Sequence, residues 1–299
     1  MSRKKRNSIQ YQVKNILDSK LRISQSKSDA KRNGTAADGI YSWETYRSYL
    51  KHGIYFAKWA KSSHGCRSLS EAQSFAGEWL SLQVDNGKSP YTVKLERAAL
   101  AKLYGCSGTD FDVSIPDRSR AGIKRSRSEA TRDKGFSEMK NREFVEFCKG
   151  TGLRRSELRA LTGDKLIDRG NGNFAILVNS GSKGGRVREA PIIGPHAVEI
   201  ASRMQQAGNG KVWASLPSHA DIHGYRAQYA ASLYRQCARP ISEVKNKPFY
   251  DKGRHKVVSG VYCCRKDRVG TKYDRRALYY VSVALGHSRI DVVPEHYLH

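Results

Sequence analysis

The strongest constraint on the fold is the segment 113–135, where apolar side chains become rare and basic ones dominate. It contains Pro116-Asp-Arg-Ser-Arg120 and Ile123-Lys-Arg-Ser-Arg127. Because a segment of this composition cannot form a hydrophobic core, it is expected to join two modules that pack separately. A chain of 299 residues is long enough for two domains. We therefore expect a helical module at 41–112, a basic linker at 113–135 and a second module at 136–299.

The first forty residues are basic and rich in serine, with Asn33-Gly34 and Asp38-Gly39 as breaks. This composition predicts a flexible segment over 1–40, in which a helix can form at Ile9–Leu21.

The module at 41–112 shows three helical patterns, each preceded by serine, which is a favoured N-cap residue. Ser42 precedes an apolar stripe from Tyr46 to Ala57, and Ser70 precedes a second pattern. Ser89-Pro90 opens a third helix, because proline is tolerated in the first helical turn. Gly105 follows this helix and is suited to end it.

The module at 136–299 mixes helical and strand patterns. Ser137 is expected to cap a helix, and Asp274 to cap a late one that ends at Gly286. Phe174–Asn179 and Val187–Ile193 are expected to form a hairpin. The predicted fold class is therefore mainly α with a small antiparallel β-sheet (α+β).

The charge balance points to a polyanionic partner. The chain has 54 Lys and Arg against 28 Asp and Glu, a formal net charge of +26. Nucleic acid is the favoured partner. An anionic membrane surface and structural RNA are the alternatives, although no basic amphipathic helix with a bulky apolar face stands out. No apolar stretch long enough for a transmembrane helix and no secretory signal is found, so we expect a cytoplasmic, nucleoid-associated protein without membrane contact.

The linker supplies the first candidate DNA contacts. Five basic side chains lie there between the two modules, and we interpret them as DNA-binding rather than merely solvated: Arg118, Arg120, Lys124, Arg125 and Arg127. The six cysteines show no C-x-x-C spacing and are interpreted as reduced thiols. A zinc site at Cys263-Cys264 with Cys237 and His255 is a minor alternative, because adjacent ligands fit known zinc spacings poorly.

Four short motifs carry the candidate chemistry, although each alone has an ordinary interpretation as surface side chains. Arg154 follows a turn and precedes a helix, where a guanidinium can hold a phosphate. Lys183 lies in a glycine-rich turn between the two expected strands. His223 and Arg226 share one helix face. His287 is followed by Tyr297, whose phenol needs nearby cations because its ordinary pKa is about 10.

Taken together, the motifs resemble those of the tyrosine recombinase (phage integrase) family. Thr151-Gly-Leu-Arg-Arg-Ser-Glu-Leu158 resembles the family's first box, and Ser182-Lys-Gly-Gly-Arg-Val-Arg-Glu-Ala-Pro191 its lysine hairpin. His223-Gly-Tyr-Arg226 resembles the second box, and Leu285-Gly-His-Ser288 with Tyr297 the third. The resemblance covers 136–299 well and implies a helical core-binding domain followed by a tyrosine recombinase catalytic domain.

The resemblance implies a role for each residue. Tyr297 would be the nucleophile that forms a 3′-phosphotyrosyl bond with DNA, and Arg154 and Arg226 would clamp the phosphate. Lys183 would protonate the leaving 5′-oxygen, His223 would give acid–base support, and His287 would bind the phosphate or orient its neighbours. Glu157 would position the cations. No metal or other cofactor is implied, and the expected partner is a pair of double-stranded DNA sites bound by a homotetramer.

The chain departs from the family pattern in several places. Ala227 stands where the second box usually continues with histidine, and 236–272 is expected to be an insertion, with a strand at Val257–Cys264. Only Leu298 and His299 follow Tyr297, whereas many relatives carry a further helix that docks on a neighbouring subunit. Either another element serves this purpose or the chain is truncated.

Three functions fit these observations. The first is a site-specific recombinase that integrates or excises a mobile element. The second is DNA relaxation of the type IB topoisomerase kind, which shares the chemistry but needs no partner site. The third is a non-catalytic DNA-binding protein that retains the fold. The complete set of catalytic residue types favours the first.

Overall fold

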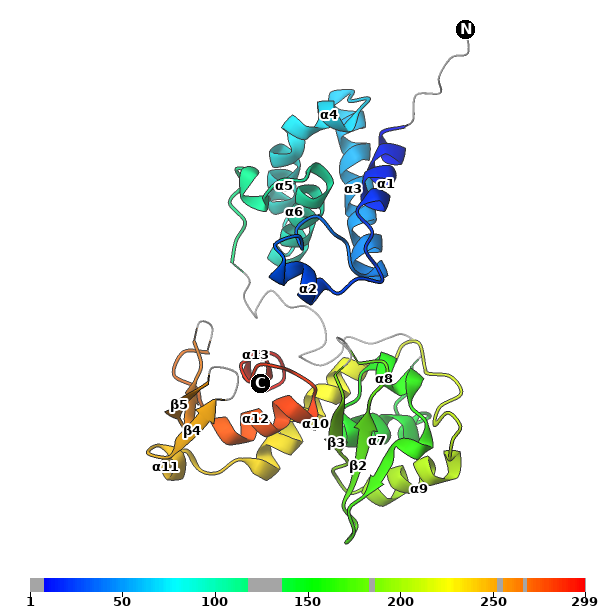
Figure 1. Cartoon of the computed structure of the whole chain (residues 1–299), viewed down its shortest axis with the longest axis vertical. Helices are drawn as coiled ribbons and strands as arrows, with labels where there is room; N and C mark the ends of the chain where they lie inside the picture. Colours follow the sequence, from blue (N-terminus) through cyan, green and yellow to red (C-terminus); the bar gives the residue numbers. More distant parts are fainter. Residues whose placement is uncertain (1–7, 118–135, 183–185, 252–254, 266–267, 299) are drawn as a thin grey trace. The chain divides into compact units, whose positions relative to one another are not determined.

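The computed structural model describes residues 8–117, 136–182, 186–251, 255–265 and 268–298. The chain divides into two compact units, Met1–Gly122 and Ile123–His299, and each is described by itself (Figure 1). The architecture is mainly helical with small antiparallel sheets, as the sequence predicted. Within the described ranges, no helix is both long and apolar enough to span a membrane.

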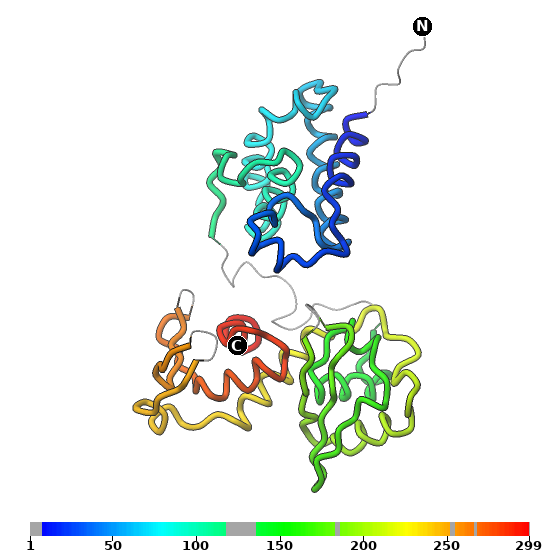
Figure 2. Tube along the Cα trace, viewed as in Figure 1, coloured from blue at the N-terminus to red at the C-terminus, as the bar shows by residue number. Residues whose placement is uncertain are grey.

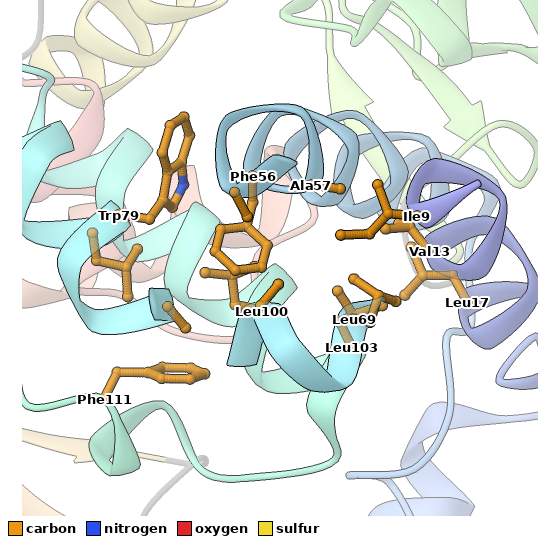
Figure 3. Packing of buried hydrophobic residues seen from close by; sticks show 14 of the residues in the cluster. Ile9, Val13, Leu17, Phe56, Ala57, Leu69, Trp79, Leu100, Leu103 and Phe111 are labelled. Carbon is orange, nitrogen blue, oxygen red and sulfur yellow. The ribbon is translucent and has the colours of Figure 1, made fainter. Parts of the chain in front are cut away.

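The first unit is a bundle of helices around one apolar core. Its described helices are α1 (Ile9–Ser19), α2 (Lys27–Arg32), α3 (Trp43–His64), α4 (Leu69–Ala72), α5 (Ala76–Asp85), α6 (Pro90–Tyr104) and the 3₁₀ turns Gln73–Phe75 and Gly108–Asp110. Figure 3 shows the core, where Phe56 of α3 and Leu100 of α6 meet between Trp79 and the side chains of α1.

The N-terminal segment differs from the flexible stretch that its composition predicted. Ile9, Val13 and Leu17 recur every four residues and are buried against α3. Gly53 permits this contact, because a Cβ there would lie only 2.8 Å from Val13. The basic and serine residues occupy the outer face, so the helix expected at Ile9–Leu21 is part of the core, although the composition of the segment predicted flexibility.

In the first unit, the expected caps are found with one correction. Ser42 accepts from the Thr45 backbone N–H at 3.2 Å, and Ser89 accepts from that of Thr92 at 3.3 Å. The predicted cap Ser70 is wrong, since it lies within α4 and Ser68 caps this helix instead.

The second unit contains three short sheets and seven described helices. The strands are β1 (Leu166–Asp168), β2 (Phe174–Val178), β3 (Arg188–Pro191), β4 (Pro248–Asp251), β5 (Lys256–Ser259), β6 (Val261–Cys263) and β7 (Lys272–Asp274). The helices are α7 (Arg142–Thr151), α8 (Arg155–Ala160), α9 (Ala197–Ala207), α10 (Ile222–Cys237), α11 (Ile241–Val244), α12 (Arg275–Ala284) and α13 (Val292–His296), together with the 3₁₀ turn Gly163–Lys165.

Helix α10 joins two groups of elements in this unit. On one side lie the antiparallel sheet β1-β2-β3 and the helices α7, α8 and α9, which share one apolar cluster. On the other lie α12 and α13, and the tube in Figure 2 shows the end of the chain turning back beside α12. Polar side chains of α8 and α10 and of the residues that follow α12 and α13 converge where the two groups meet.

Two local expectations need correction. Ser137 caps only a turn, in which its hydroxyl accepts from the Lys140 N–H at 3.3 Å, and α7 begins later, after Asn141. The strand expected over Val257–Cys264 is split into β5 and β6 by Gly260. A Cβ at this position would lie 2.7 Å from the Lys247 carbonyl oxygen, so the close approach of two chain segments requires glycine here.

Candidate active site

Arg154 stands at the junction of α7 and α8. Gly152 ends α7 in the left-handed conformation, with a φ of 60°, and two residues later Arg154 becomes the N-cap of α8. The Arg154 backbone N–H donates to Glu157 Oε2 at 2.8 Å, and its guanidinium donates to Glu157 Oε1 at 2.8 Å. The arginine is therefore fixed at the start of α8 by the carboxylate of Glu157.

Glu157 is the centre of an arginine–glutamate cluster formed by Arg154, Glu157, Arg188 and Arg226. Arg188 donates to both carboxylate oxygens, at 2.9 and 2.8 Å, and both of these side chains are buried. Burial alone would raise the pKa of Glu157, but the hydrogen bonds and charge of Arg188 outweigh it, and the pKa falls to about 2. Glu157 therefore stays ionised and neutralises part of the arginine charge.

Arg226 is almost completely buried, with 1% of its surface exposed. Its guanidinium donates to the carbonyl oxygens of Gly152 and Leu285, so one side chain ties α10 to the ends of α7 and α12. Burial lowers the pKa of Arg226 to about 10, which leaves it charged at neutral pH. Its Nε–H faces the hydroxyl of Tyr297, with 3.4 Å between Nε and the phenol oxygen.

His287 lies in the turn that follows α12. Ser282 closes this turn by donating to the Arg289 carbonyl oxygen at 2.9 Å. Burial and the neighbouring charges of Arg226, Arg154 and Arg188 lower the pKa of His287 to about 3. The imidazole is therefore neutral at physiological pH and has one nitrogen free to accept a hydrogen bond.

Tyr297 follows the last turn of α13 and points into this group of side chains. Its hydroxyl lies 3.2 Å from His287 Nε2, and the two rings are 5.6 Å apart between centroids. The Arg226 guanidinium lies 5.8 Å from the centre of the phenol ring. The candidate nucleophile is thus half-buried beside one neutral imidazole and one buried cation.

The other predicted site residues are placed less fully. His223 lies on the first turn of α10, exposed and one turn before Arg226. Lys183 lies outside the described residues, but the turn that leads to it is held against α8, since Ser156 donates to the Gly181 carbonyl oxygen at 2.7 Å. The five linker residues fall within 118–135, also outside the described part of the chain.

Arg188 is a site residue that the sequence analysis did not single out. A usable signal exists in the strand pattern, because Arg188, Ala190 and Ile192 are buried while Glu189 is exposed. Period-two alternation traced back from Ile192 therefore predicts that Arg188 points inward. An inward arginine needs a buried acceptor, and Glu157 of the first motif supplies it.

The arrangement suits an anionic ligand. Three guanidinium groups share the single Glu157 carboxylate, which leaves an excess of positive charge beside the Tyr297 hydroxyl. Such charge stabilises both a phenolate and the added negative charge of a phosphoryl transition state. Among the described residues, no three His, Cys, Asp or Glu side chains gather as a metal ion would require.

Comparisons with known proteins identify the fold. No family model matches the chain. No curated protein matches it in sequence. In structure it is similar to the XerH site-specific recombinase bound to palindromic difH substrate in a post-cleavage complex, with a TM-score of 0.56 and 15% identity over 97% of this chain and 92% of that one. It is also similar to XerH in a pre-cleavage complex with difH, with a TM-score of 0.55 and 16% identity over 98% of this chain and 94% of that one.

These likenesses extend over nearly the whole chain, so they include both compact units. At 15 and 16% identity they establish the fold alone, which is the fold of the XerH site-specific recombinase. Function is argued from the side chains of the site.

Proposed function

We propose that the protein is a site-specific DNA recombinase that cleaves and rejoins DNA through Tyr297. The observation that carries this proposal is the convergence of the Tyr297 hydroxyl with His287 Nε2 at 3.2 Å and Arg226 Nε at 3.4 Å. A phenol is a poor nucleophile unless cations stabilise its anion, and the site offers a buried guanidinium for this purpose. The two XerH structures of the same fold contain DNA substrates, which supports the choice of DNA.

The proposed reaction is a reversible transfer of a phosphoryl group. The Tyr297 oxygen attacks a DNA phosphorus, the bond from phosphorus to the 5′-oxygen breaks, and a 3′-phosphotyrosyl bond forms. The phenol gives its proton to a base, the role we assign to His223. The leaving 5′-oxygen takes a proton from Lys183. A 5′-hydroxyl from a second strand then attacks the phosphotyrosine and reverses the bond changes, so no metal or nucleotide is consumed.

The remaining residues of the site hold and shield the phosphate. Arg154 and Arg226 would bind its non-bridging oxygens, since a guanidinium donates two parallel hydrogen bonds to an anion. Glu157 and Arg188 would keep these arginines in place through their buried ion pair. His287 would orient the phenol and contact the phosphate.

The wider assembly follows from the same proposal. Two duplex recombination sites would be held by four copies of the chain, with Arg118, Arg120, Lys124, Arg125 and Arg127 of the linker contacting the DNA backbone. A net charge of +26 supports such contacts, and binding should weaken steeply with salt. We assign the protein to the integration or excision of a mobile element in the cytoplasm, on nucleoid DNA.

A nicked DNA duplex tests the chemistry, because the short fragment that carries the released 5′-hydroxyl diffuses away and the covalent intermediate is trapped. The wild-type chain should form a protein–DNA adduct that survives denaturation, and Tyr297→Phe should form none. An adduct that persists in Tyr297→Phe would exclude this nucleophile. If no adduct forms in the wild type with DNA that carries its target site, the catalytic proposal fails and binding alone remains.

A further inference from the structure

The segment that carries Tyr297 is short and needs support from elsewhere. Helix α13 has only five residues, and a helix of this length is not stable by itself. Val293 and Leu298 are buried in the apolar cluster of α10 and α12, which holds one side of the segment. The other side of the segment receives hydrogen bonds from a donor outside the helix.

Arg268, from the insertion at 236–272, supplies this donor. Its Nη1 donates to the Pro294 carbonyl oxygen at 3.2 Å and also to the Leu298 carbonyl oxygen. These two carbonyls lie on either side of Tyr297, three residues before it and one residue after it. A single guanidinium therefore binds the backbone on both sides of the candidate nucleophile.

Arg268 is itself fixed by the hairpin β6–β7. Its Nη2 donates to the hydroxyl of Tyr273, and the guanidinium lies 5.5 Å from the centre of that ring. Tyr273 is buried on β7 and packs edge-on against Tyr234 of α10, with 5.5 Å between ring centroids. The Thr271 N–H donates to the Arg268 carbonyl oxygen at 3.1 Å, which closes the turn that presents the arginine.

We propose that Arg268 is a positioning residue that holds Tyr297 in its own chain's active site for attack on DNA. The inference deepens the proposed function and rests on it. Arg268 touches the backbone around Tyr297, whereas His287 and Arg226 touch its hydroxyl, so backbone and side chain are restrained by different parts of the fold. The segment 236–272, expected to be an insertion, would thus help to position the nucleophile.

This role has a kinetic consequence. Without Arg268, the Tyr297 segment would leave the site for part of the time, and cleavage would slow by the fraction of time lost. In the covalent intermediate the phosphotyrosyl bond itself keeps Tyr297 in place. Religation of a preformed adduct should therefore remain close to the wild-type rate.

The test compares four full-length proteins on the nicked substrate: the wild type, Arg268→Ala, Tyr273→Phe and Arg265→Ala. Arg265 is an exposed arginine of the same insertion, so its removal controls for the loss of one positive charge. Single-turnover adduct formation should fall on the order of 10- to 100-fold in Arg268→Ala, because small misplacement of a nucleophile has effects of this size. Tyr273→Phe, which keeps the buried ring, should show a smaller loss, and Arg265→Ala none.

DNA affinity and religation rate separate positioning from other effects. In Arg268→Ala, the DNA affinity and the religation rate should stay within about twofold of the wild type, while adduct formation falls on the order of 10- to 100-fold. Equal cleavage by Arg268→Ala and the wild type would overturn the inference, as would an equal loss of cleavage and religation. If Arg268→Ala does not fold, Tyr273→Phe decides, and wild-type cleavage by that variant would overturn the inference. If the wild type itself forms no adduct, the proposed function fails instead.

Discussion

The side chains of Arg188 and Glu157 form a two-point ion pair, with Nη1 at 2.9 Å from Oε1 and Nη2 at 2.8 Å from Oε2. Arg188 also donates from Nε to the Ala284 carbonyl oxygen at 2.8 Å. The pair thus links β3, α8 and the end of α12. Burial makes the geometry of the pair rigid, because neither charged group can exchange its partner for a water molecule.

Removal of the Glu157 charge should destabilise the protein strongly. Glu157→Gln leaves Arg188 and Arg226 buried without a counter-charge, and the free energy of unfolding should fall by about 3–5 kcal/mol. Glu189→Gln is the matched control, since its pair with Arg169 is exposed, at 47% and 56% of the side-chain surfaces. For this control, chemical denaturation should show a loss of less than about 1 kcal/mol in the free energy of unfolding. Similar losses in both variants would contradict the role given to the buried pair.

Arg154→Ala should separate catalysis from binding. The arginine is one of many cations on the chain, so the DNA affinity of the variant should change little. The salt dependence of the affinity should weaken by about one phosphate contact. Adduct formation should fall by at least about 100-fold, because a donor to the transition-state oxygens is lost. Filter binding and covalent trapping measure the two quantities.

Arg159→Ala provides the comparison for this experiment. Arg159 is an exposed arginine of the same helix, and its loss removes the same charge from α8. It should cleave at the wild-type rate. A comparable fall in cleavage for both variants would mean that general attraction to DNA, rather than a phosphate clamp, explains the effect of Arg154.

The sequence predicted those features that depend on neighbouring residues. Ser89-Pro90 and Asp274 marked helix starts correctly, because capping is decided within one turn. The sequence did not predict β1, a three-residue strand that forms only because β2 pairs with it. It also gave no partner for Arg188, since Glu157 lies 31 positions away and the pairing depends on how β3 packs against α8. Both the strand β1 and the partner of Arg188 therefore depend on long-range packing, which local sequence patterns do not reveal.

Gly152 should tolerate no side chain. Its φ of +60° is strained for other residues, and a Cβ would lie 2.3 Å from the ring of Tyr229. Gly170→Ala, at a φ of +78° with open space around the Cβ, measures the backbone strain alone, about 1–2 kcal/mol. Gly152→Ala should lower the free energy of unfolding by about 1–3 kcal/mol more. Equal losses in the two variants would show that Tyr229 moves away without cost.

His287 should make the protein less stable in mild acid. Its pKa is about 3 in the folded chain, against an ordinary value of 6.5. Between these values the unfolded chain binds a proton that the folded chain does not, so stability rises with pH and is lost as the pH falls below 6.5. The lowered pKa of Glu157 also makes the protein less stable in acid, but only as the pH falls below 4.5, the ordinary pKa of a glutamate.

His287→Gln cannot take up this proton and isolates its contribution. Between pH 5 and 6.5, above the range of Glu157, the wild type should lose stability faster than the variant, by up to about 1.4 kcal/mol per pH unit for one proton. Chemical denaturation at several pH values across this window measures the two slopes. Parallel slopes would mean that the imidazole is already protonated in the folded protein, and a neutral His287 beside the Tyr297 hydroxyl would have to be abandoned.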